Sequence, residues 1–178
     1  MNTGKIALIT GGTRGLGLNT ALKLAESGAD IILTYRSNAA DGAATVAKIQ
    51  KLGRQAVALP LDVSDSRGFA AFAQEVKAAL AATWQRDTFD YLVNNAGIGI
   101  NASVAETTEE QFDTLVNIHL KGPFFLTQNL LGLIADGGRI VNISSGLARF
   151  ALPGFAAYAA AKGGVEVLTR YMAKELGP

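Results

Sequence analysis

Short apolar runs alternate with longer amphipathic stretches along this chain, and this alternation limits the fold more than any other feature. Continuous apolar runs are typical of strands that are buried on both faces, and the stretches between them have the period of helices. The pattern therefore predicts an α/β fold, a doubly wound parallel sheet with helices on both faces. Right-handed crossovers favour the strand order 3-2-1-4-5.

The runs and stretches give approximate bounds for each element. The predicted strands cover residues 5–10, 30–35, 55–61, 89–94 and 139–144. The predicted helices cover residues 15–27, 39–52, 66–83, 108–135 and 156–176, with a break in the fourth near Gly122 and Pro123. Gly28, Gly53 and the pair at 137–138 lie where helices are expected to end, as C-terminal glycines do.

Composition and charge narrow the classes of function. The chain of 178 residues is 49% hydrophobic and contains no repeat or linker, which predicts a single domain over residues 1–178. A net charge of +1 creates no field that attracts nucleic acid or anionic lipid, so we expect neither partner. The absence of cysteine excludes a disulfide framework and a thiolate metal site, and we expect no metal. The opening residues 1–5 lack the pattern of a signal peptide, so a cytoplasmic location is expected.

A glycine-rich turn follows the first predicted strand. Its residues are Thr10-Gly11-Gly12-Thr13-Arg14-Gly15-Leu16-Gly17, and a helix is predicted to begin inside it. Glycines let a backbone turn tightly and approach a pyrophosphate, whose charge is met by free N–H groups at the start of the helix. An ordinary strand-to-helix turn can contain the same glycines, but the strand before and the helix after favour a dinucleotide site in a Rossmann-type fold. The turn's candidate ligands are Gly11, Thr13, Arg14, Gly15, Leu16 and Gly17.

The end of the second predicted strand indicates which dinucleotide is bound. An acidic residue there binds the ribose hydroxyls of NAD, and a cationic residue accepts the 2′-phosphate of NADP. This chain has Thr34-Tyr35-Arg36-Ser37, with no acid, and Arg14 in the glycine turn can reach the same corner. Both arginines can also be solvated loop residues. Their convergence predicts NADP(H) in preference to NAD(H), with Tyr35, Arg36 and Ser37 among the ligands.

A tyrosine and a lysine share one face of the last predicted helix. Tyr158 and Lys162 are four residues apart, and an ammonium group near a phenol favours the phenolate, which can exchange a proton with a substrate oxygen. A surface tyrosine beside a solvated lysine has the same spacing. However, the fifth predicted strand leads into Ser145, which places a hydroxyl at the same end of the sheet.

Taken together, these motifs resemble the short-chain dehydrogenase/reductase family. The matching residues are Thr10-Gly11-x-x-x-Gly15-x-Gly17, Asp62-Val63, Asn94-Asn95-Ala96-Gly97, Ser145 and Tyr158-x-x-x-Lys162. They lie in the family's order and span nearly the whole chain.

The resemblance implies a role for each matching residue. Asp62 is expected to bind the adenine amino group, with a backbone contact from Val63. Asn94 and the backbone of Ala96 and Gly97 are expected to line the cofactor channel. Ser145 is then expected to orient the substrate oxygen, Tyr158 to act as general acid or base, and Lys162 to hold the nicotinamide ribose.

One departure from the family pattern concerns His119, the only histidine. It occupies the position where most members have an asparagine, which stabilises a helical kink and holds a water that links the lysine to solvent. The resemblance implies the same role for His119, and because it is an imidazole we also expect its charge to change near neutral pH. The His119→Asn variant is then expected to have a flatter pH response. Alternatively, His119 packs in the helix and takes no part in proton transfer.

A second departure is that the chain stops at Pro178, whereas family members continue with two more strands and a loop over the substrate. The resemblance therefore implies that the last strands of the fold are missing, and we expect poor solubility of this piece alone. It also implies a homodimer or homotetramer of the full-length form, paired through helices 108–135 and 156–176. The outward apolar positions that fit such pairing are Phe124, Phe125, Ala159, Ala160 and Val167.

These features predict an NADPH-dependent oxidoreductase of the carbonyl reductase or alcohol dehydrogenase type. It transfers hydride between the nicotinamide and a ketone or alcohol carbon of a small molecule, with Tyr158 as the proton-transfer residue. The alternative is a non-catalytic dinucleotide-binding module or an inactive fragment of such an enzyme. The early stop of the chain favours this alternative, whereas the joint presence of Ser145, Tyr158 and Lys162 disfavours it.

Overall fold

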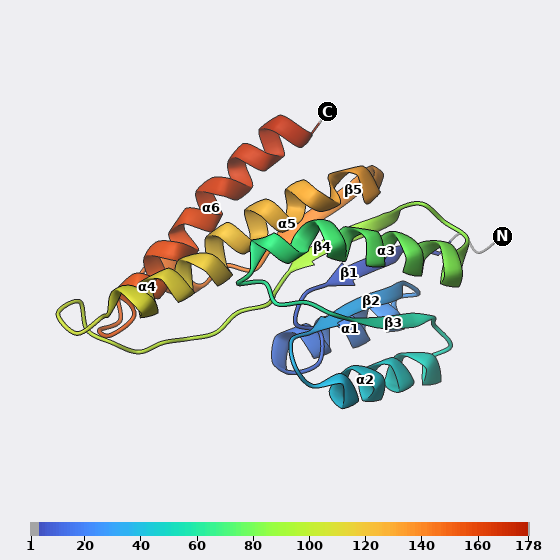
Figure 1. Ribbon diagram of the computed structural model, residues 1–178, viewed down its shortest axis with the longest axis horizontal. Coiled ribbons are helices and arrows are strands. Elements are labelled where there is room, and N and C mark those ends of the chain that lie inside the picture. Colours follow the sequence, from blue (N-terminus) through green and yellow to red (C-terminus); the bar gives the residue numbers. More distant parts are fainter. Residues whose placement is uncertain (1–3, 178) are drawn as a thin grey trace.

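The computed structural model, which describes residues 4–177, has a parallel sheet of five strands (Figure 1). The strand order β3-β2-β1-β4-β5 and the parallel pairing of every neighbour confirm the predicted topology. Residues 1–3 of the opening segment, and Pro178, lie outside the described residues. The strands are β1 (Ile6–Ile9), β2 (Asp30–Tyr35), β3 (Ala56–Pro60), β4 (Phe89–Asn94) and β5 (Ile134–Asn142).

Six α-helices within residues 4–177 connect and cover these strands. They are α1 (Gly15–Glu26), α2 (Ala39–Lys51), α3 (Phe69–Trp84), α4 (Glu109–Val116), α5 (Gly122–Leu130) and α6 (Ala156–Leu176). Gly28 and Gly53 adopt left-handed φ angles of +96° and +76° just after α1 and α2, which confirms their predicted role at helix ends. In this part of the chain, no helix combines the length and the apolar character needed to cross a bilayer.

Two hydrophobic cores, one on each face of the sheet, hold the layers together. Because successive side chains of a strand point to opposite faces, Ile6 and Leu8 of β1 pack with residues of α3 and α5. Ala7 and Ile9 of the same strand pack with residues of α1 and α2. This two-sided burial confirms that helices cover both faces, and Figure 1 shows α1 and α2 on the side of the sheet away from α3 and α5.

The helix predicted over residues 108–135 is divided near Gly122 as predicted, but it ends earlier than predicted, at Leu130. Thr108 caps α4, a π-helical turn follows at Asn117–Lys121, and α5 begins at Gly122. Pro123 has no N–H for the carbonyl of His119, four residues before it, so the regular hydrogen-bond ladder cannot continue there. The Gly122 N–H instead bonds to the carbonyl of Asn117. The predicted break near Gly122 thus has the form of a π-turn that ends directly before this residue.

The fifth strand also differs from its prediction. It begins at Ile134, which pairs with Phe89, and its pairing with β4 is interrupted before Arg139 pairs with Tyr91. Residues 137–138 therefore lie within an irregular part of β5 rather than at a helix end, because α5 has already ended at Leu130. Gly137 has a left-handed φ of +73°. Glycines with this conformation occur both at helix ends and at irregularities in strands, so the glycine pair alone does not distinguish the two.

A buried carboxylate joins the amino-terminal ends of β1 and β4. Asp90, whose side chain is 4% exposed, accepts hydrogen bonds from Lys5 Nζ at 2.8 Å, the Ile6 N–H at 2.9 Å and Arg86 Nη1 at 3.0 Å. Burial opposes the ionisation of Asp90, but these hydrogen bonds outweigh it and hold the pKa of Asp90 below its ordinary value. The ionised carboxylate therefore stabilises the folded state.

The Asp90→Ala variant is expected to lose about 2–3 kcal/mol of unfolding free energy in urea denaturation at pH 7, because two cations and one N–H lose their acceptor. Since the folded pKa is lowered, the contribution of Asp90 is present above its unfolded pKa and is lost as the pH falls below about 4. The stability difference between variant and parent should therefore shrink in acid. The matched control is Asp113→Ala, which changes an exposed carboxylate on α4 that forms no ion pair within residues 4–177 and should change stability little. Equal losses in both variants would contradict the role of Asp90.

Candidate active site

A cleft of ≈ 690 Å³ lies where the chain leaves the carboxyl ends of the strands. Its walls come from the segments that follow each of the five strands, together with the start of α6 and the π-turn. It is lined by every predicted site residue except Asn94. These residues are Gly11, Thr13, Arg14, Gly15, Leu16, Gly17, Tyr35, Arg36, Ser37, Asp62, Val63, Ala96, Gly97, His119, Ser145, Tyr158 and Lys162.

The glycine turn between β1 and α1 has the geometry of an anion cradle. Gly11 and Gly15 have left-handed φ angles of +64° and +53°. At Gly17, a Cβ atom would lie 2.2 Å from the Gly11 carbonyl oxygen, so only glycine fits there. α1 begins with no side-chain cap and no acidic residue in its first turn, which leaves N–H groups and the positive end of the helix dipole open to an anion.

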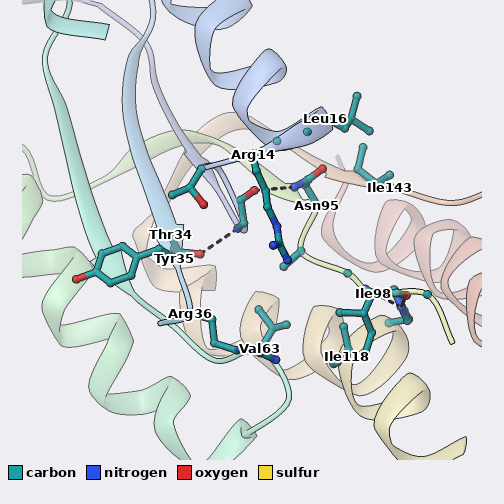
Figure 2. Close-up of a pocket in the computed structure, with 18 of the residues that line it drawn as sticks. Arg14, Leu16, Thr34, Tyr35, Arg36, Val63, Asn95, Ile98, Ile118 and Ile143 are labelled. Carbon is teal, nitrogen blue, oxygen red and sulfur yellow. Dashed lines mark hydrogen bonds between the residues drawn. The ribbon is translucent and has the colours of Figure 1, made fainter. Parts of the chain in front are cut away.

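Two exposed arginines line the cleft, Arg14 within this turn and Arg36 directly after β2. Within residues 4–177 neither Arg14 nor Arg36 forms an ion pair, so both guanidinium groups are available. Figure 2 shows the side chain of Arg14 extending from the start of α1 into the cleft, with the ring of Tyr35 turned away from it. That ring lies against α2, where a Cβ at Gly42 would approach it to 2.9 Å. A doubly charged phosphate is the kind of ligand that two free guanidinium groups suit.

The loop after β3 is fixed by its own side chains. The carboxylate of Asp62 accepts hydrogen bonds from the Ser64 N–H at 2.9 Å and the Ser64 hydroxyl at 2.6 Å. Next to it, the carbonyl oxygen of Val63 lies so close to α5 that a Cβ at Gly122 would approach it to 2.6 Å. The two predicted adenine contacts are thus held in a tight turn at the rim of the cleft.

Asn95, rather than Asn94, connects the loop after β4 to the glycine turn. Its side-chain Nδ2 donates to the carbonyls of Thr10 at 2.8 Å and Gly11 at 3.2 Å, and its N–H donates to the Thr10 hydroxyl at 3.0 Å. Asn94 is buried away from the cleft, where its Nδ2 donates to Asn142 Oδ1 at 2.8 Å and Thr127 Oγ1 at 3.2 Å. The structure therefore does not place Asn94 with the other predicted cofactor ligands.

Ser145, Tyr158 and Lys162 all line the cleft. Tyr158 lies in the first turn of α6, and Lys162 lies one turn later with its Nζ 5.8 Å from the centre of the phenol ring. The Lys162 Nζ donates to the carbonyl of Ile143 at 2.6 Å, and burial lowers the pKa of Lys162. The hydroxyl of Ser145 accepts from the Leu147 N–H at 3.2 Å. A hydroxyl, a phenol and an amine thus line one cleft with the glycine turn, as the sequence predicted.

His119, in the π-turn, packs edge-on against Tyr158. The two ring centres are 5.0 Å apart, and the rings are inclined at 82°. His119 Nε2 lies 2.7 Å from the carbonyl oxygen of Ile98 and 3.4 Å from its backbone nitrogen, and the shorter contact assigns the ring proton to Nε2. Nδ1 is then an acceptor, and it is buried without a hydrogen-bond partner among the described residues. A Cβ at Gly97 would lie 2.7 Å from the ring, so this glycine makes room for the histidine.

The expected charge change of His119 near neutral pH is wrong. Burial, reinforced by the charge of Lys162, lowers the pKa of His119 to about 4, although the hydrogen bond to Ile98 opposes the shift. The imidazole is therefore neutral at pH 7. It can accept and donate hydrogen bonds, but it does not titrate in the physiological range.

The cleft also has lining residues that the sequence reasoning missed. A local signal existed for Asn95, which lies inside the quoted Asn-Asn-Ala-Gly motif, and for Thr34, which precedes Tyr35 at the end of β2. The apolar members carry no local pattern, because their place in the wall depends on the packing of distant segments. The missed residues are Thr34, Asn38, Asp41, Leu61, Asn95, Ile98, Gly99, Ile118, Ile143, Leu147 and Phe155.

Known proteins with similar sequences are dehydrogenases and reductases. The sequence model of the family described as short chain dehydrogenase matches residues 5–178. The short-chain dehydrogenase/reductase FrzI of Cladobotryum sp is 36% identical over 173 residues, which are 97% of this chain and 65% of FrzI. The tetrahydroxynaphthalene reductase PfmaG of Pestalotiopsis fici is 35% identical over 98% of this chain and 61% of PfmaG. The chain thus spans less than two thirds of the length of these relatives.

Solved structures share the fold. The landomycin C-6 ketoreductase LanV, with bound NADP and rabelomycin, superposes with a TM-score of 0.94 and 34% identity, covering 98% of this chain and 71% of LanV. The reductase LugOII, described as catalysing keto-reduction at C1 in lugdunomycin biosynthesis, gives a TM-score of 0.94 and 38% identity, covering 99% of this chain and 73% of LugOII. From the family match and these relatives, the chain belongs to the short chain dehydrogenase family.

Proposed function

We propose that the protein is an NADPH-dependent oxidoreductase that interconverts a ketone and an alcohol, with Tyr158 as the general acid or base. The observation that carries the proposal is that Ser145, Tyr158 and Lys162 line the same cleft as the glycine turn. The reductase names of the relatives and the NADP held by LanV support it. The substrate is then a small-molecule carbonyl or alcohol compound.

The residues of the cleft fit an NADP molecule. The glycine turn and the uncapped start of α1 suit a pyrophosphate, and Arg14 and Arg36 suit a 2′-phosphate. Asp62 and Val63 border the expected adenine end, and Lys162 is the residue we assign to the nicotinamide ribose. When bound, the nicotinamide supplies or accepts the hydride.

The chain's own side chains divide the remaining work. Ser145 orients the substrate oxygen through its hydroxyl, and Tyr158 transfers a proton to or from that oxygen. Lys162 places its amine 5.8 Å from the centre of the phenol ring. His119 fixes the ring of Tyr158 by edge-on packing, and its free Nδ1 is an acceptor for a water molecule next to Lys162.

Further parts of the proposal concern the whole protein. Residues 1–178 form one dinucleotide-binding domain, located in the cytoplasm. A homodimer or homotetramer is supported by the exposed apolar side chains of Phe124, Phe125 and Val167 on α5 and α6, which are 42%, 38% and 44% exposed. Ala160 on α6 is exposed, and Ala159 is half-buried.

The Tyr158→Phe variant is expected to lose activity by about 10²-fold or more while binding NADPH as the parent does, because only the proton-transferring hydroxyl is removed. Turnover of a ketone panel and titration of NADPH fluorescence measure the two effects. Tyr171→Phe, which changes an exposed tyrosine further along α6, is the matched control and should behave as the parent. Binding of NADPH by the parent without turnover of any ketone would support the non-catalytic module instead.

The Arg36→Asp variant is expected to bind NADPH at least about tenfold more weakly, because a carboxylate replaces a partner of the 2′-phosphate. Binding of NADH should be unchanged or tighter, since a carboxylate suits the ribose hydroxyls. Parallel fluorescence titrations with both cofactors measure the change in preference. Arg170→Asp, at an exposed position of α6, controls for the change in net charge. If Arg36→Asp weakens the binding of NADPH and NADH equally, the assignment of Arg36 to the 2′-phosphate is wrong.

Variants of His119 are expected to separate positioning from proton relay. Because burial holds the pKa of His119 at about 4, the imidazole stays neutral above about pH 6. His119→Asn should therefore keep the shape of the pH profile of kcat from about pH 6 to 9. His119→Ala removes the edge-on contact with Tyr158 and should lower kcat about tenfold at every pH in that range. If the pH profile of kcat is flatter in His119→Asn than in the parent, the result would support a proton-relay role for His119.

A further inference from the structure

A second cavity, of ≈ 620 Å³, adjoins the cleft. It lies between residues 103–104, in the loop after β4, and residues 147–156, which lead from β5 into α6; we call it the apolar pocket. Leu147 and Phe155 line both the cleft and the apolar pocket. The two spaces are therefore neighbours that share side-chain walls.

The shared walls stand next to the groups proposed to hold the substrate oxygen. The N–H of Leu147 donates to the hydroxyl of Ser145 at 3.2 Å. The ring of Phe155 lies 6.5 Å from the ring of Tyr158, centre to centre. A carbonyl oxygen held by Ser145 and Tyr158 is thus near Leu147 and Phe155, the two walls that the cleft shares with the apolar pocket.

The lining of the apolar pocket offers mainly hydrocarbon contacts. Val104, Phe150 and Leu152 are 80%, 62% and 52% exposed, which is a large solvent exposure for clustered apolar side chains. The polar side chains of the lining are engaged elsewhere. The Ser103 hydroxyl donates to Glu106 at 2.7 Å, and Arg149, the only charged residue of the lining, has its guanidinium 4.0 Å from the carboxylate of Glu166.

The walls of the apolar pocket are fixed by backbone contacts. The Ala102 N–H donates to the carbonyl of Gly154 at 2.9 Å, which joins the two loops. Gly154 has a left-handed φ of +86°, and a Cβ there would lie 2.4 Å from the side chain of Asn101. The ring of Phe150 covers Gly146, where a Cβ would lie 2.6 Å from it. These contacts join the two loops that form the apolar pocket.

We propose that the apolar pocket binds the hydrocarbon body of the substrate, so that the substrate is a ketone with an apolar fused-ring system of two or more rings. The proposal rests on the proposed function, because the position of the carbonyl group is taken from it. The volume of the pocket is in the range that suits a drug-sized ligand. Contact with the rings of Phe150 and Phe155 contributes binding free energy for a flat ring system. A short or charged substrate lacks this contribution.

The test compares binding and turnover in the Leu152→Asp variant, which introduces a carboxylate at a half-exposed wall position. The dissociation constant of 2-naphthol, followed by its own fluorescence, should rise at least about tenfold, because a charge opposes burial of the rings. With NADPH, kcat/KM for 2-tetralone should fall similarly, and kcat/KM for acetone should stay within about twofold. Leu52→Asp, at the end of α2 and 43% exposed, is the matched control and should change none of these values.

Val104→Asp places the same charge on the opposite wall and covers the case in which Leu152→Asp does not fold. Unchanged binding of 2-naphthol in a folded variant would overturn the proposal. The proposal would also be overturned if the variants bound 2-naphthol as the parent does but changed their oligomeric state. That result would identify the apolar pocket as a contact between copies of the chain. If 2-naphthol binding is lost in the variants but the parent reduces neither ketone, the apolar pocket stands and only the reductase proposal fails.

Discussion

The hydrogen bonds from Asn95 to Thr10 and Gly11 are the interaction on which the rest of the cleft depends. Parallel strands bring the loops after β1 and β4 to the same edge of the sheet, but adjacency alone does not fix their distance. The amide of Asn95 does, because it satisfies two carbonyls of the glycine turn while the Thr10 hydroxyl accepts from the N–H groups of Asn95 and Ala96. The same amide lies where a Cβ of residue 17 would be, so the glycine and the asparagine require each other.

The π-turn at Asn117–Lys121 links the fold to the chemistry of the cleft. Pro123 breaks the hydrogen-bond ladder at the carbonyl of residue 119, and the widened turn places the ring of His119 against Tyr158 and the Gly97 backbone. The ring is buried there, which lowers its pKa and keeps it neutral. A backbone irregularity thus positions a side chain whose burial, in turn, determines its charge. The π-turn and the burial of the ring together explain why His119 acts as a fixed hydrogen-bonding group and as a packing surface for Tyr158.

The parts of the structure that the sequence predicted are those set by local periodicity. The bounds of β2, β4 and α6 agree with the alternation of apolar runs, and the spacing of Tyr158 and Lys162 places both on one helix face. The errors came from features that depend on distant contacts. The glycines at 137–138 resemble a helix end but lie in an irregular strand, Asn94 turns to Asn142 and Thr127, and the charge of His119 depends on burial that no motif encodes. Asn95 was visible in its motif, but its partners in the glycine turn required the fold.

Different surfaces carry out the proposed chemistry and select the proposed substrate: the cleft does the first and the apolar pocket the second. The cleft is lined by glycine backbone, two free arginines and the polar groups of Ser145, Tyr158 and Lys162, and this set suits a phosphate-bearing cofactor and proton transfer. The apolar pocket contributes hydrocarbon walls, and its one charged residue, Arg149, pairs with Glu166. Because only Leu147 and Phe155 belong to both, the walls that contact the carbon skeleton can vary without disturbing the groups that act on the carbonyl. A change of substrate therefore requires changes in the loops at 103–104 and 147–156, while the cofactor cradle stays as it is.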